Sequence, residues 1–207
     1  MKKKPTSSAD PRPTSYGQEY TFSFVDKFGI YLSNKKIIDF VKKHKPKRII
    51  DIGCGYNALT LQLLKPYCKD LTGVDIETDH SIKGIKFINK RVDDKLSFLK
   101  SHSADLIIMN NVLEHLRKPQ AIVNEIYRVL DKDGWFFNVV PNWRGRTFLE
   151  FAAFRLRLAP IEEMNDHVTY FDIKDVYPIL FAAGFLPINM RIGSHKFFLS
   201  TISYAKK

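Results

Sequence analysis

Cysteine is scarce in this sequence, which holds only Cys54 and Cys68 among its 207 residues. Two thiols are too few for the disulfide framework that supports many small secreted domains. We therefore expect both cysteines to be reduced. Reduced thiols favour an intracellular protein, and we expect it to be cytoplasmic.

Long apolar runs are also missing from the chain. No stretch approaches the ~20 consecutive apolar residues of a membrane-spanning helix. The N-terminal sequence MKKKPTSSADPRP begins with charge but has no apolar segment, so it does not resemble a secretory signal peptide. The remaining composition, 44% hydrophobic and 27% charged, is typical of a folded domain that buries a full core.

Acidic residues are few near the N-terminus. Residues 1–48 hold 12 Lys and Arg against 4 Asp and Glu, whereas the rest of the chain holds 21 against 18. A solubilising tail and a solvated helix face would explain this charge. Attraction to an anionic membrane, to an acidic substrate or to nucleic acid would also explain it. No RNA- or DNA-binding module accompanies the basic segment, so nucleic acid is the disfavoured partner.

The chain divides into a tail, an N-terminal segment and a main domain. Residues 1–18 are polar and contain three prolines, which predicts a disordered basic tail. In the N-terminal segment, residues 19–47, Ser33 is expected to cap a helix over 34–44. Residues 48–207 are expected to form one domain.

In the main domain, apolar strand-like runs alternate with helix-like spacing. Strands are predicted at about 48–53, 71–75, 85–89, 104–109 and 134–140, and helices at about 57–65, 119–130 and 172–183. This alternation predicts an α/β fold with a doubly wound, mostly parallel sheet. The last two strand-like runs, 185–193 and 196–205, flank the sequence GSHK and predict an antiparallel hairpin.

Residues 49–64, IIDIGCGYNALTLQLL, combine a buried strand, a glycine turn and a helix. Gly53 and Gly55 let the backbone turn sharply and approach a ligand closely. Such a turn at the carboxyl end of a strand is a common ligand site in α/β folds. A tight turn without a ligand is the alternative, because one Gly-x-Gly is a weak signal.

Two kinds of cofactor compete for this turn. Gly53, Gly55 and Ala58 also match the dinucleotide pattern G-x-G-x-x-G/A, which would bind a pyrophosphate. Asp51 argues against a phosphate, because a carboxylate there would repel a dianion. It suits a cation such as the sulfonium and ammonium of S-adenosylmethionine. Asp75 ends the next strand, about 20 residues after the glycines, where an acid would bind ribose hydroxyls of either cofactor.

At this point the chain resembles the class I S-adenosylmethionine-dependent methyltransferases. The resemblance rests on five ordered blocks over about residues 48–190, namely IIDIGCG, GVDI, ADLIIMNNVLEHL, EIYRVLDKDGWFFNVVPN and HVTYFDIKDVYPILFAAGF. It implies a Rossmann-like, seven-stranded sheet whose last strand is reversed. It also implies that residues 19–47 act as a cap over the cofactor cleft, and that an insert at about 142–167 forms the acceptor pocket.

The resemblance also assigns cofactor-binding positions. Residues at the ends of the first, second and fourth predicted strands would hold S-adenosylmethionine and its product S-adenosylhomocysteine: Asp51, Gly53, Cys54 and Gly55 at the methionine end, Asp75 at the ribose, Ile76 against the adenine, and Asn110 at the methionine ammonium. The family has an acid after the third strand for the adenine amino group, but here that position is Arg91. We therefore assign the adenine contact to the Val92 backbone and Asp93.

Two histidines are candidates for a base on the acceptor side. His115 belongs to the block NNVLEHL, and His167 follows the insert. Each would otherwise be a histidine that caps a helix or packs locally. Ubiquinone-biosynthesis O-methyltransferases carry an acid three residues before the Glu-His pair and use the group for a metal. That position is Asn111 here, so we expect no metal site.

The insert combines apolar and basic residues. Residues 147–158 have helical potential and a broad apolar surface, and arginines lie close by. A lid helix packed on the domain would explain this pattern. An interfacial helix that meets a membrane-bound acceptor would also explain it.

Together these patterns predict an enzyme that methylates a small-molecule, glycan or lipid-linked acceptor, with oxygen the favoured atom. Nucleic-acid amine methyltransferases have Asn/Asp-Pro-Pro-aromatic after the fourth strand, and this chain has MNNVLEHL there. The alternatives are a methyltransferase-fold binding or regulatory protein without turnover and an NAD-dependent oxidoreductase. Arg91 favours the first alternative, and Asp51 disfavours the second.

Overall fold

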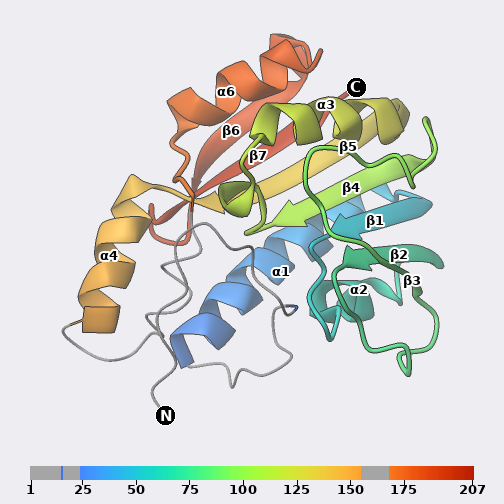
Figure 1. Ribbon diagram of the computed structural model, residues 1–207, viewed down its shortest axis with the longest axis horizontal. Helices are drawn as coiled ribbons and strands as arrows, with labels where there is room; N and C mark the ends of the chain where they lie inside the picture. Colours follow the sequence, from blue (N-terminus) through green and yellow to red (C-terminus); the bar gives the residue numbers. More distant parts are fainter. Residues whose placement is uncertain (1–14, 16–23, 155–167) are drawn as a thin grey trace.

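The structure is a computed structural model that describes residues 15, 24–154 and 168–207. At its centre is a seven-stranded sheet with the order β3-β2-β1-β4-β5-β7-β6 (Figure 1). The strands are β1 Arg48–Ile52, β2 Asp70–Asp75, β3 Lys86–Asn89, β4 Ala104–Asn110, β5 Leu130–Pro141, β6 Met190–His195 and β7 Ser200–Lys206. The helices are α1 Phe24–His44, α2 Leu59–Leu64, α3 Pro119–Val129, α4 Trp143–Phe154 and α6 Ile173–Ala182, with 3-10 turns η1 Leu113–His115 and η2 Pro187–Asn189.

Strands β1 to β5 are parallel, and β7 runs antiparallel to both β5 and β6. The predicted doubly wound sheet and the antiparallel hairpin are therefore confirmed. Ser200 pairs with Pro141 on one side and with His195 on the other. The β6–β7 turn consequently lies at the same sheet edge as the carboxyl ends of the parallel strands, which is where ligands bind in such folds.

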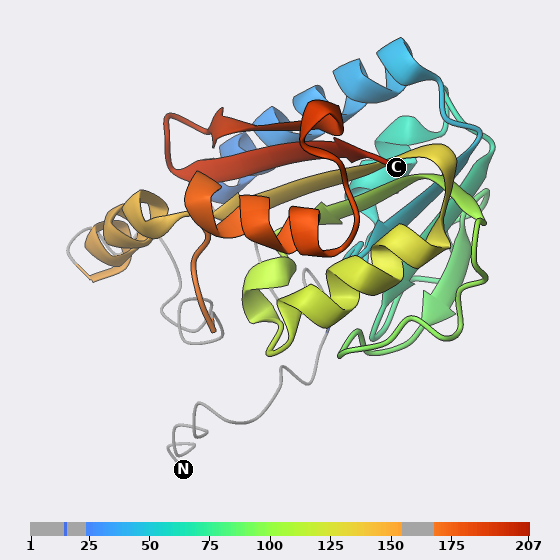
Figure 2. The same ribbon diagram turned by 90° about the horizontal axis from the view of Figure 1, so that it is seen from above.

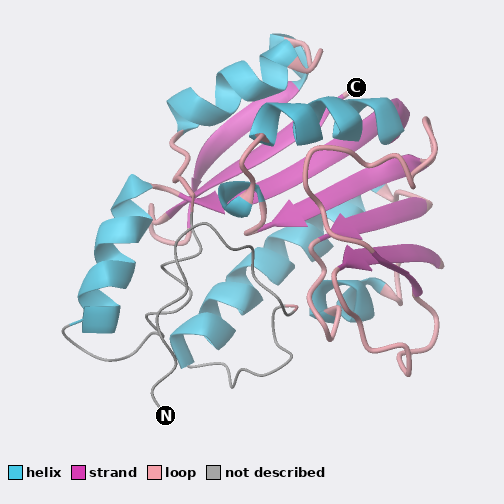
Figure 3. Ribbon diagram, viewed as in Figure 1, coloured by secondary structure: helices cyan, strands magenta, loops and turns pink. Residues whose placement is uncertain are grey.

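Helices cover both faces of the sheet, as Figures 2 and 3 show. On one face, α3 and α6 bury a cluster that includes Ile122, Val123, Ile126, Val176 and Leu180. On the other face, α1 and α2 bury a cluster that includes Ile37, Val41, Leu61 and Leu64. Because both faces are covered, the central strands are apolar on both sides, and this explains their continuous hydrophobic runs.

Phe40 attaches α1 to the sheet. Its ring lies edge-on to Trp135 and Phe137, with centroids 5.3 and 5.6 Å away, and stacks on Tyr204 at 5.2 Å. These partners come from β5 and β7. The N-terminal segment is therefore bound to the domain by an aromatic cluster as well as by the chain that leads into β1.

The start of α1 differs from the prediction. The helix was expected to begin after Ser33, but it begins at Phe24, and Ser33 is fully buried inside it. The segment before Ser33 contains no proline, and its apolar residues extend the helix toward the sheet edge. Ser33 is therefore not an N-cap. Its hydroxyl faces protein rather than the first turn of a helix.

Other bounds differ by a few residues. β5 starts at Leu130 rather than at 134, and a register shift between Ala104 and Leu106 accommodates the longer strand. The helix expected over 147–158 begins at Trp143 and is described as far as Phe154. Its last predicted residues lie outside the described ranges. Among the described helices, none is long and apolar enough to cross a bilayer.

Replacing Phe40 by alanine should destabilise the whole domain. Because the ring is buried against three aromatic neighbours, we expect Phe40→Ala to lower the free energy of unfolding by about 3–5 kcal/mol. Urea denaturation monitored by circular dichroism would measure this. Tyr31→Ala, on the same helix but 59% exposed, is the control and should change stability by less than about 0.5 kcal/mol. Equal effects would mean that α1 is not held to the sheet as described.

Candidate functional site

The predicted cofactor residues gather where β1, β2 and β4 end. Ile52 pairs with Val74 on one side and with Met109 on the other. Gly53 therefore follows β1 directly between Asp75 at the end of β2 and Asn110 at the end of β4. Between β1 and β4 the chain changes its direction of winding, and this switch point is the usual ligand crevice of the fold.

The loop after β1 requires its glycines. Gly53 has φ +75°, and a Cβ at this residue would overlap the side chain of Val112. Gly55 also adopts a left-handed conformation, with φ +72°. The amides of Gly53 and Cys54 donate to the carbonyl of Val74 at 2.8 and 3.2 Å. Glycine at both positions avoids strain on a loop that other residues would distort.

Asp75 is held as an acceptor of hydrogen bonds. Its Oδ2 accepts from the Gly55 amide at 2.8 Å, and its Oδ1 accepts from the Ile76 amide at 2.8 Å. The Ser15 hydroxyl also donates to Oδ1, at 2.6 Å, and accepts from the Glu77 amide at 2.7 Å. A hydroxyl group thus already donates to this carboxylate. Ser15 is buried, although it falls in the range expected to form a disordered tail.

Asp51 is a buried acid that lies close to the carboxylate of Asp75. Its side chain is buried, and burial raises its pKa well above the usual range, with a further increase from the charge of Asp75. Burial and the same two carboxylates also raise the pKa of the Cys54 thiol. Cys54 is therefore a protonated, unreactive thiol. A bound cation would relieve the repulsion between Asp51 and Asp75.

A further acceptor lies beside this acidic pair. The Oδ1 atom of Asn110 is buried and has no hydrogen-bond partner among the described residues. Because an unpaired buried acceptor is unfavourable, this atom indicates a missing donor such as an ammonium group. The sequence pattern assigned only the backbone carbonyl of Asn110 to this role, whereas the structure shows that its side-chain oxygen is also available.

The predicted adenine side is less well defined. Val92 packs against the cluster under α3 and α6, and Asp93 is exposed. Asp94 is paired with Lys118 at 3.0 Å, so its carboxylate is already engaged. Ile76 is partly buried next to Asp75. The assignments of Val92 and Asp93 to the adenine stay predictions.

One of the two candidate bases, His115, lies in the 3-10 turn that follows β4. His115 is partly buried in η1, directly after the buried Glu114. The Glu114 carbonyl accepts from the amides of Val168 and Thr169 at 2.9 and 3.3 Å, so the chain returns beside η1 at Val168. His167 lies outside the described residues, and its role stays a prediction. Within the described ranges, no group of three or more His, Cys, Asp or Glu side chains could hold a metal ion.

The β6–β7 turn was missed as part of the site. Its residues Lys196, Phe197 and Phe198 are all left-handed, with φ of 49°, 55° and 67°. Each such residue costs about 1–2 kcal/mol. Asn142, at the end of β5, holds the turn: its amide donates to Leu199 O at 3.3 Å, and its side-chain Nδ2 donates to Phe198 O at 2.9 Å.

Lys196 is the charged residue of this turn. The residue as a whole is partly exposed, but its ammonium group is surrounded by protein. Burial lowers the pKa of Lys196 to about 8, and the Glu114 carboxylate opposes this decrease. Nothing in the sequence GSHK distinguishes this lysine from an ordinary turn residue. Its surroundings come from α1 and η1, which are distant in the chain.

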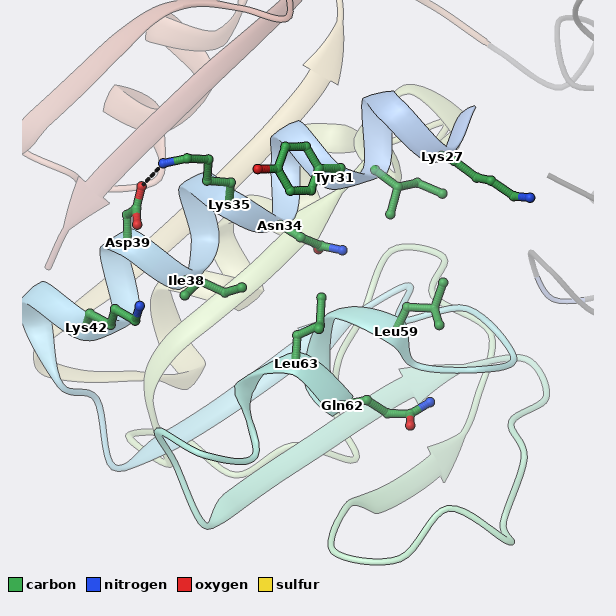
Figure 4. Close-up of a pocket in the computed structure, with 11 residues that line it drawn as sticks. Lys27, Tyr31, Asn34, Lys35, Ile38, Asp39, Lys42, Leu59, Gln62 and Leu63 are labelled. Carbon is green, nitrogen blue, oxygen red and sulfur yellow. Dashed lines mark hydrogen bonds and ion pairs between the residues drawn. The ribbon is translucent and has the colours of Figure 1, made fainter. Parts of the chain in front are cut away.

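A separate groove of about 670 Å³ lies between α1 and α2 (Figure 4). Tyr31 and Leu63 project into it, and a salt bridge of 3.2 Å joins Lys35 to Asp39 at its rim. None of its lining residues is among the predicted cofactor positions. The groove lies over the two helices rather than at the carboxyl edge of the sheet, so the cofactor is not assigned to it.

Comparison with known proteins identifies the family. A model of the methyltransferase domain matches residues 20–188. The ubiquinone biosynthesis O-methyltransferase of Neisseria meningitidis serogroup C is 25% identical over 140 residues, which is 59% of this chain and 58% of that protein. The chain thus matches less than two thirds of the length of this relative.

Solved structures share the fold. A SAM-dependent methyltransferase from Thermotoga maritima aligns with a TM-score of 0.60 at 16% identity, covering 89% of this chain and 96% of that one. The plantazolicin methyltransferase BpumL, solved with a substrate analogue and SAH, aligns with a TM-score of 0.63 at 15% identity, covering 87% and 84%. At these identities the likeness concerns the fold alone.

Replacing Asp51 by asparagine should stabilise the empty protein while weakening cofactor binding. The raised pKa of Asp51 means that the folded state keeps a proton which the unfolded state loses near pH 4. The wild type therefore loses stability as the pH rises through the raised value, whereas the variant does not. We expect Asp51→Asn to be more stable than the wild type at pH 8, and to bind S-adenosylmethionine at least about tenfold more weakly.

Thermal melts at pH 4.5 and pH 8, with calorimetric titration of the cofactor, would measure both effects. Asp39→Asn, in an exposed ion pair, is the control and should change neither. A variant that binds the cofactor as tightly as the wild type would remove Asp51 from the site.

Proposed function

This chain belongs to the family of methyltransferase domains, and from that premise we propose that it transfers a methyl group from S-adenosylmethionine to an oxygen of a small-molecule, glycan or lipid-linked acceptor. S-adenosylhomocysteine is the other product. The observation that carries this proposal is the pair of acids, Asp51 and Asp75, on either side of the Gly53–Gly55 loop. Asp51 suits a cation, and Asp75 already accepts a hydrogen bond from the Ser15 hydroxyl.

The same pair disfavours a dinucleotide. A pyrophosphate at this loop would approach Asp51 in a buried environment, where repulsion between like charges is strong. The ribose of S-adenosylmethionine would donate its hydroxyls to Asp75, in the manner of Ser15. Its ammonium group would donate to Asn110, whose side-chain oxygen has no other described donor. BpumL, a protein of the same fold, was solved with SAH, and this supports the same class of cofactor here.

The cofactor, when bound, supplies a methyl group that its sulfonium activates for displacement. The protein's own residues then have two tasks. They align the acceptor with the methyl group, which can account for much of the rate. They also receive the proton that an acceptor hydroxyl loses as its oxygen bonds to carbon. His167 is our first candidate for that base, with His115 in η1 as the second.

Oxygen is favoured as the acceptor atom because the relative from Neisseria meningitidis is named a ubiquinone biosynthesis O-methyltransferase. A membrane-bound acceptor would also suit the basic residues at the start of α4. Exposed Arg144 and Arg146 lie at the start of α4, and Arg146 stacks over the rings of Trp143 and Tyr170. Arginine and aromatic side chains of this kind are suited to a peripheral contact with anionic lipid.

The alternative is a binding or regulatory protein that holds the cofactor without turnover. The departure at Arg91, where the family has an acid, is the observation that favours it. Cofactor binding does not separate the two functions, whereas methyl transfer does.

Calorimetric titration with S-adenosylmethionine, S-adenosylhomocysteine and NAD tests the cofactor. We expect micromolar binding of the first two and none of NAD. Asp75→Ala should abolish this binding because the ribose loses its acceptor. Asp70→Ala, at the other end of β2 in an exposed pair with Lys86, should leave binding intact. Failure of the wild type to bind either sulfur compound would overturn the proposal.

His167→Ala should lower turnover by about 10²-fold or more while cofactor affinity is unchanged, the effect expected for a lost general base. Initial rates would be measured with labelled S-adenosylmethionine and an acceptor found by screening hydroxylated compounds. His115→Ala serves as the comparison, because it removes the second candidate. Unchanged turnover in His167→Ala would exclude that histidine from the mechanism.

A further inference from the structure

The left-handed β6–β7 turn lies at the edge where the acceptor must meet the cofactor. Three consecutive non-glycine residues in this conformation are uncommon, and strain of this kind is concentrated at functional sites. Asn142 fixes the turn to the end of β5 through two hydrogen bonds. The backbone is therefore held in a conformation that local sequence alone would not favour.

The turn directs a lysine toward the rest of the site. The Lys196 Nζ atom lies 3.9 Å from the position that a Cβ on Gly29 would take, so the side chain reaches the first half of α1. The charge of Glu114 in η1 also acts on Lys196.

The 3-10 turn η1 connects the surroundings of Lys196 with the Gly53–Gly55 loop. Val112 directly precedes η1, and its side chain fills the space in front of Gly53. Glu114 follows two residues later. Lys196 and the glycine loop thus both lie near this turn, Lys196 through Glu114 and the loop through Val112. Both are at the carboxyl edge of the sheet, where the acceptor would meet the cofactor.

An aromatic surface continues from the lysine. Phe197 stacks on Phe28 of α1 with ring centroids 6.3 Å apart, and the two residues are 74% and 44% exposed. Large exposed aromatic side chains at a crevice are suited to bind an apolar or aromatic ligand. A cation next to such a surface matches an acceptor whose reacting hydroxyl ionises on an apolar or aromatic body.

We propose that the Lys196 ammonium group contacts the acceptor oxygen and stabilises the negative charge that develops as its hydroxyl is deprotonated. This inference rests on the proposed methyltransferase function and adds a residue to it. The hydroxyl proton passes to the base, the oxygen bonds to the methyl carbon, and the bond from that carbon to sulfur breaks with its electron pair left on sulfur. Lys196 keeps its proton throughout and supplies only charge.

Three charged or titratable groups act on Lys196 or on the histidine next to it in the chain. Glu114 in η1 favours its protonated form. His195 precedes it in the chain, and Lys36 of α1 acts on that histidine. Burial and the charges of Lys196 and Lys36 lower the pKa of His195 to about 4. The imidazole is therefore neutral near pH 7 and adds no charge. Lys196 is therefore a desolvated cation in the turn at the carboxyl edge of the sheet.

The probe for this role is 4-nitrocatechol, whose phenolate absorbs visible light. The full-length protein would first be loaded with S-adenosylhomocysteine, and the ionisation of bound 4-nitrocatechol would be followed by spectrophotometry. We expect the bound probe to ionise about one pH unit or more below the free probe, as a nearby opposite charge produces. Lys196→Met should remove this difference, and Lys196→Arg should retain it.

The pH dependence gives a second, more specific readout. Because the pKa of Lys196 is about 8, the ammonium charge is lost as the pH rises through that value. The affinity for the 4-nitrocatechol phenolate, measured by spectrophotometric titration, should therefore weaken above pH 8 in the wild type. It should persist there in Lys196→Arg, because arginine stays charged. A purely structural role for Lys196 would not produce this difference.

Lys174→Met, an exposed lysine on α6, is the matched control and should behave as the wild type. Thermal melts would establish that Lys196→Met folds. Lys196→Arg, which keeps the positive charge, provides a second test. A wild-type shift that survives in Lys196→Met, or no shift at all in protein that binds S-adenosylhomocysteine, would overturn the inference. Protein that does not bind S-adenosylhomocysteine would instead overturn the proposed function.

Discussion

The repulsion between Asp51 and Asp75 is the constraint on which the site depends. The two carboxylates end neighbouring parallel strands, and one of them is buried. Burial of a carboxylate is unfavourable unless something compensates it. Backbone amides donate to Asp75, whereas burial and, secondarily, the charge of Asp75 raise the pKa of Asp51. The empty protein is therefore less stable than it could be, and a cationic ligand would recover that stability.

Such a site needs a rigid support, and the two-sided sheet provides it. The strands that carry Asp51 and Asp75 are packed between α1 and α2 on one face and α3 and α6 on the other. At the amino end of β1, Arg48 bonds to both Asp105 and Asp131, and so joins β1, β4 and β5. The unfavourable groups at the carboxyl edge are thus offset by satisfied ion pairs and apolar packing elsewhere in the same strands.

The sequence was most informative where one local signal decides the structure. The apolar run Ile49–Ile52 and the following glycines predicted β1 and its loop, and the paired runs around GSHK predicted the hairpin. It was less informative where distant segments decide the outcome. The start of α1 at Phe24 depends on packing against the hairpin turn, as in the contact between Phe28 and Phe197. The local preference of Ser33 for an N-cap position carries no information about that contact.

The same limit applies to the site. Asp51 and Asp75 were predicted from their places at or next to strand ends, which converge in a parallel sheet, and Asn110 was predicted from the resemblance to methyltransferases. Ser15 and Lys196 were not found, since a tail serine and a turn lysine carry no pattern of their own. Ser15 is significant through its bond to Asp75, and Lys196 through Glu114 and α1. Such residues can be recognised only after the chain has brought the segments together.

The two sides of the crevice carry opposite charge, and this has a consequence for the proposed reaction. Methyl transfer from a sulfonium to an ionised hydroxyl consumes one positive and one negative charge at the same moment. Asp51 would stabilise the first and Lys196 the second, so both stabilise the reactants more than the products. At the transition state the charges of the reactants are already partly neutralised. Close alignment of the reacting atoms, rather than charge, must therefore lower the barrier there. Because these groups bind the charged reactants more strongly than the neutral products, they would also favour release of the products. We therefore view Asp51 and Lys196 as groups that assemble two charged reactants, and the fixed strand ends as the source of their alignment.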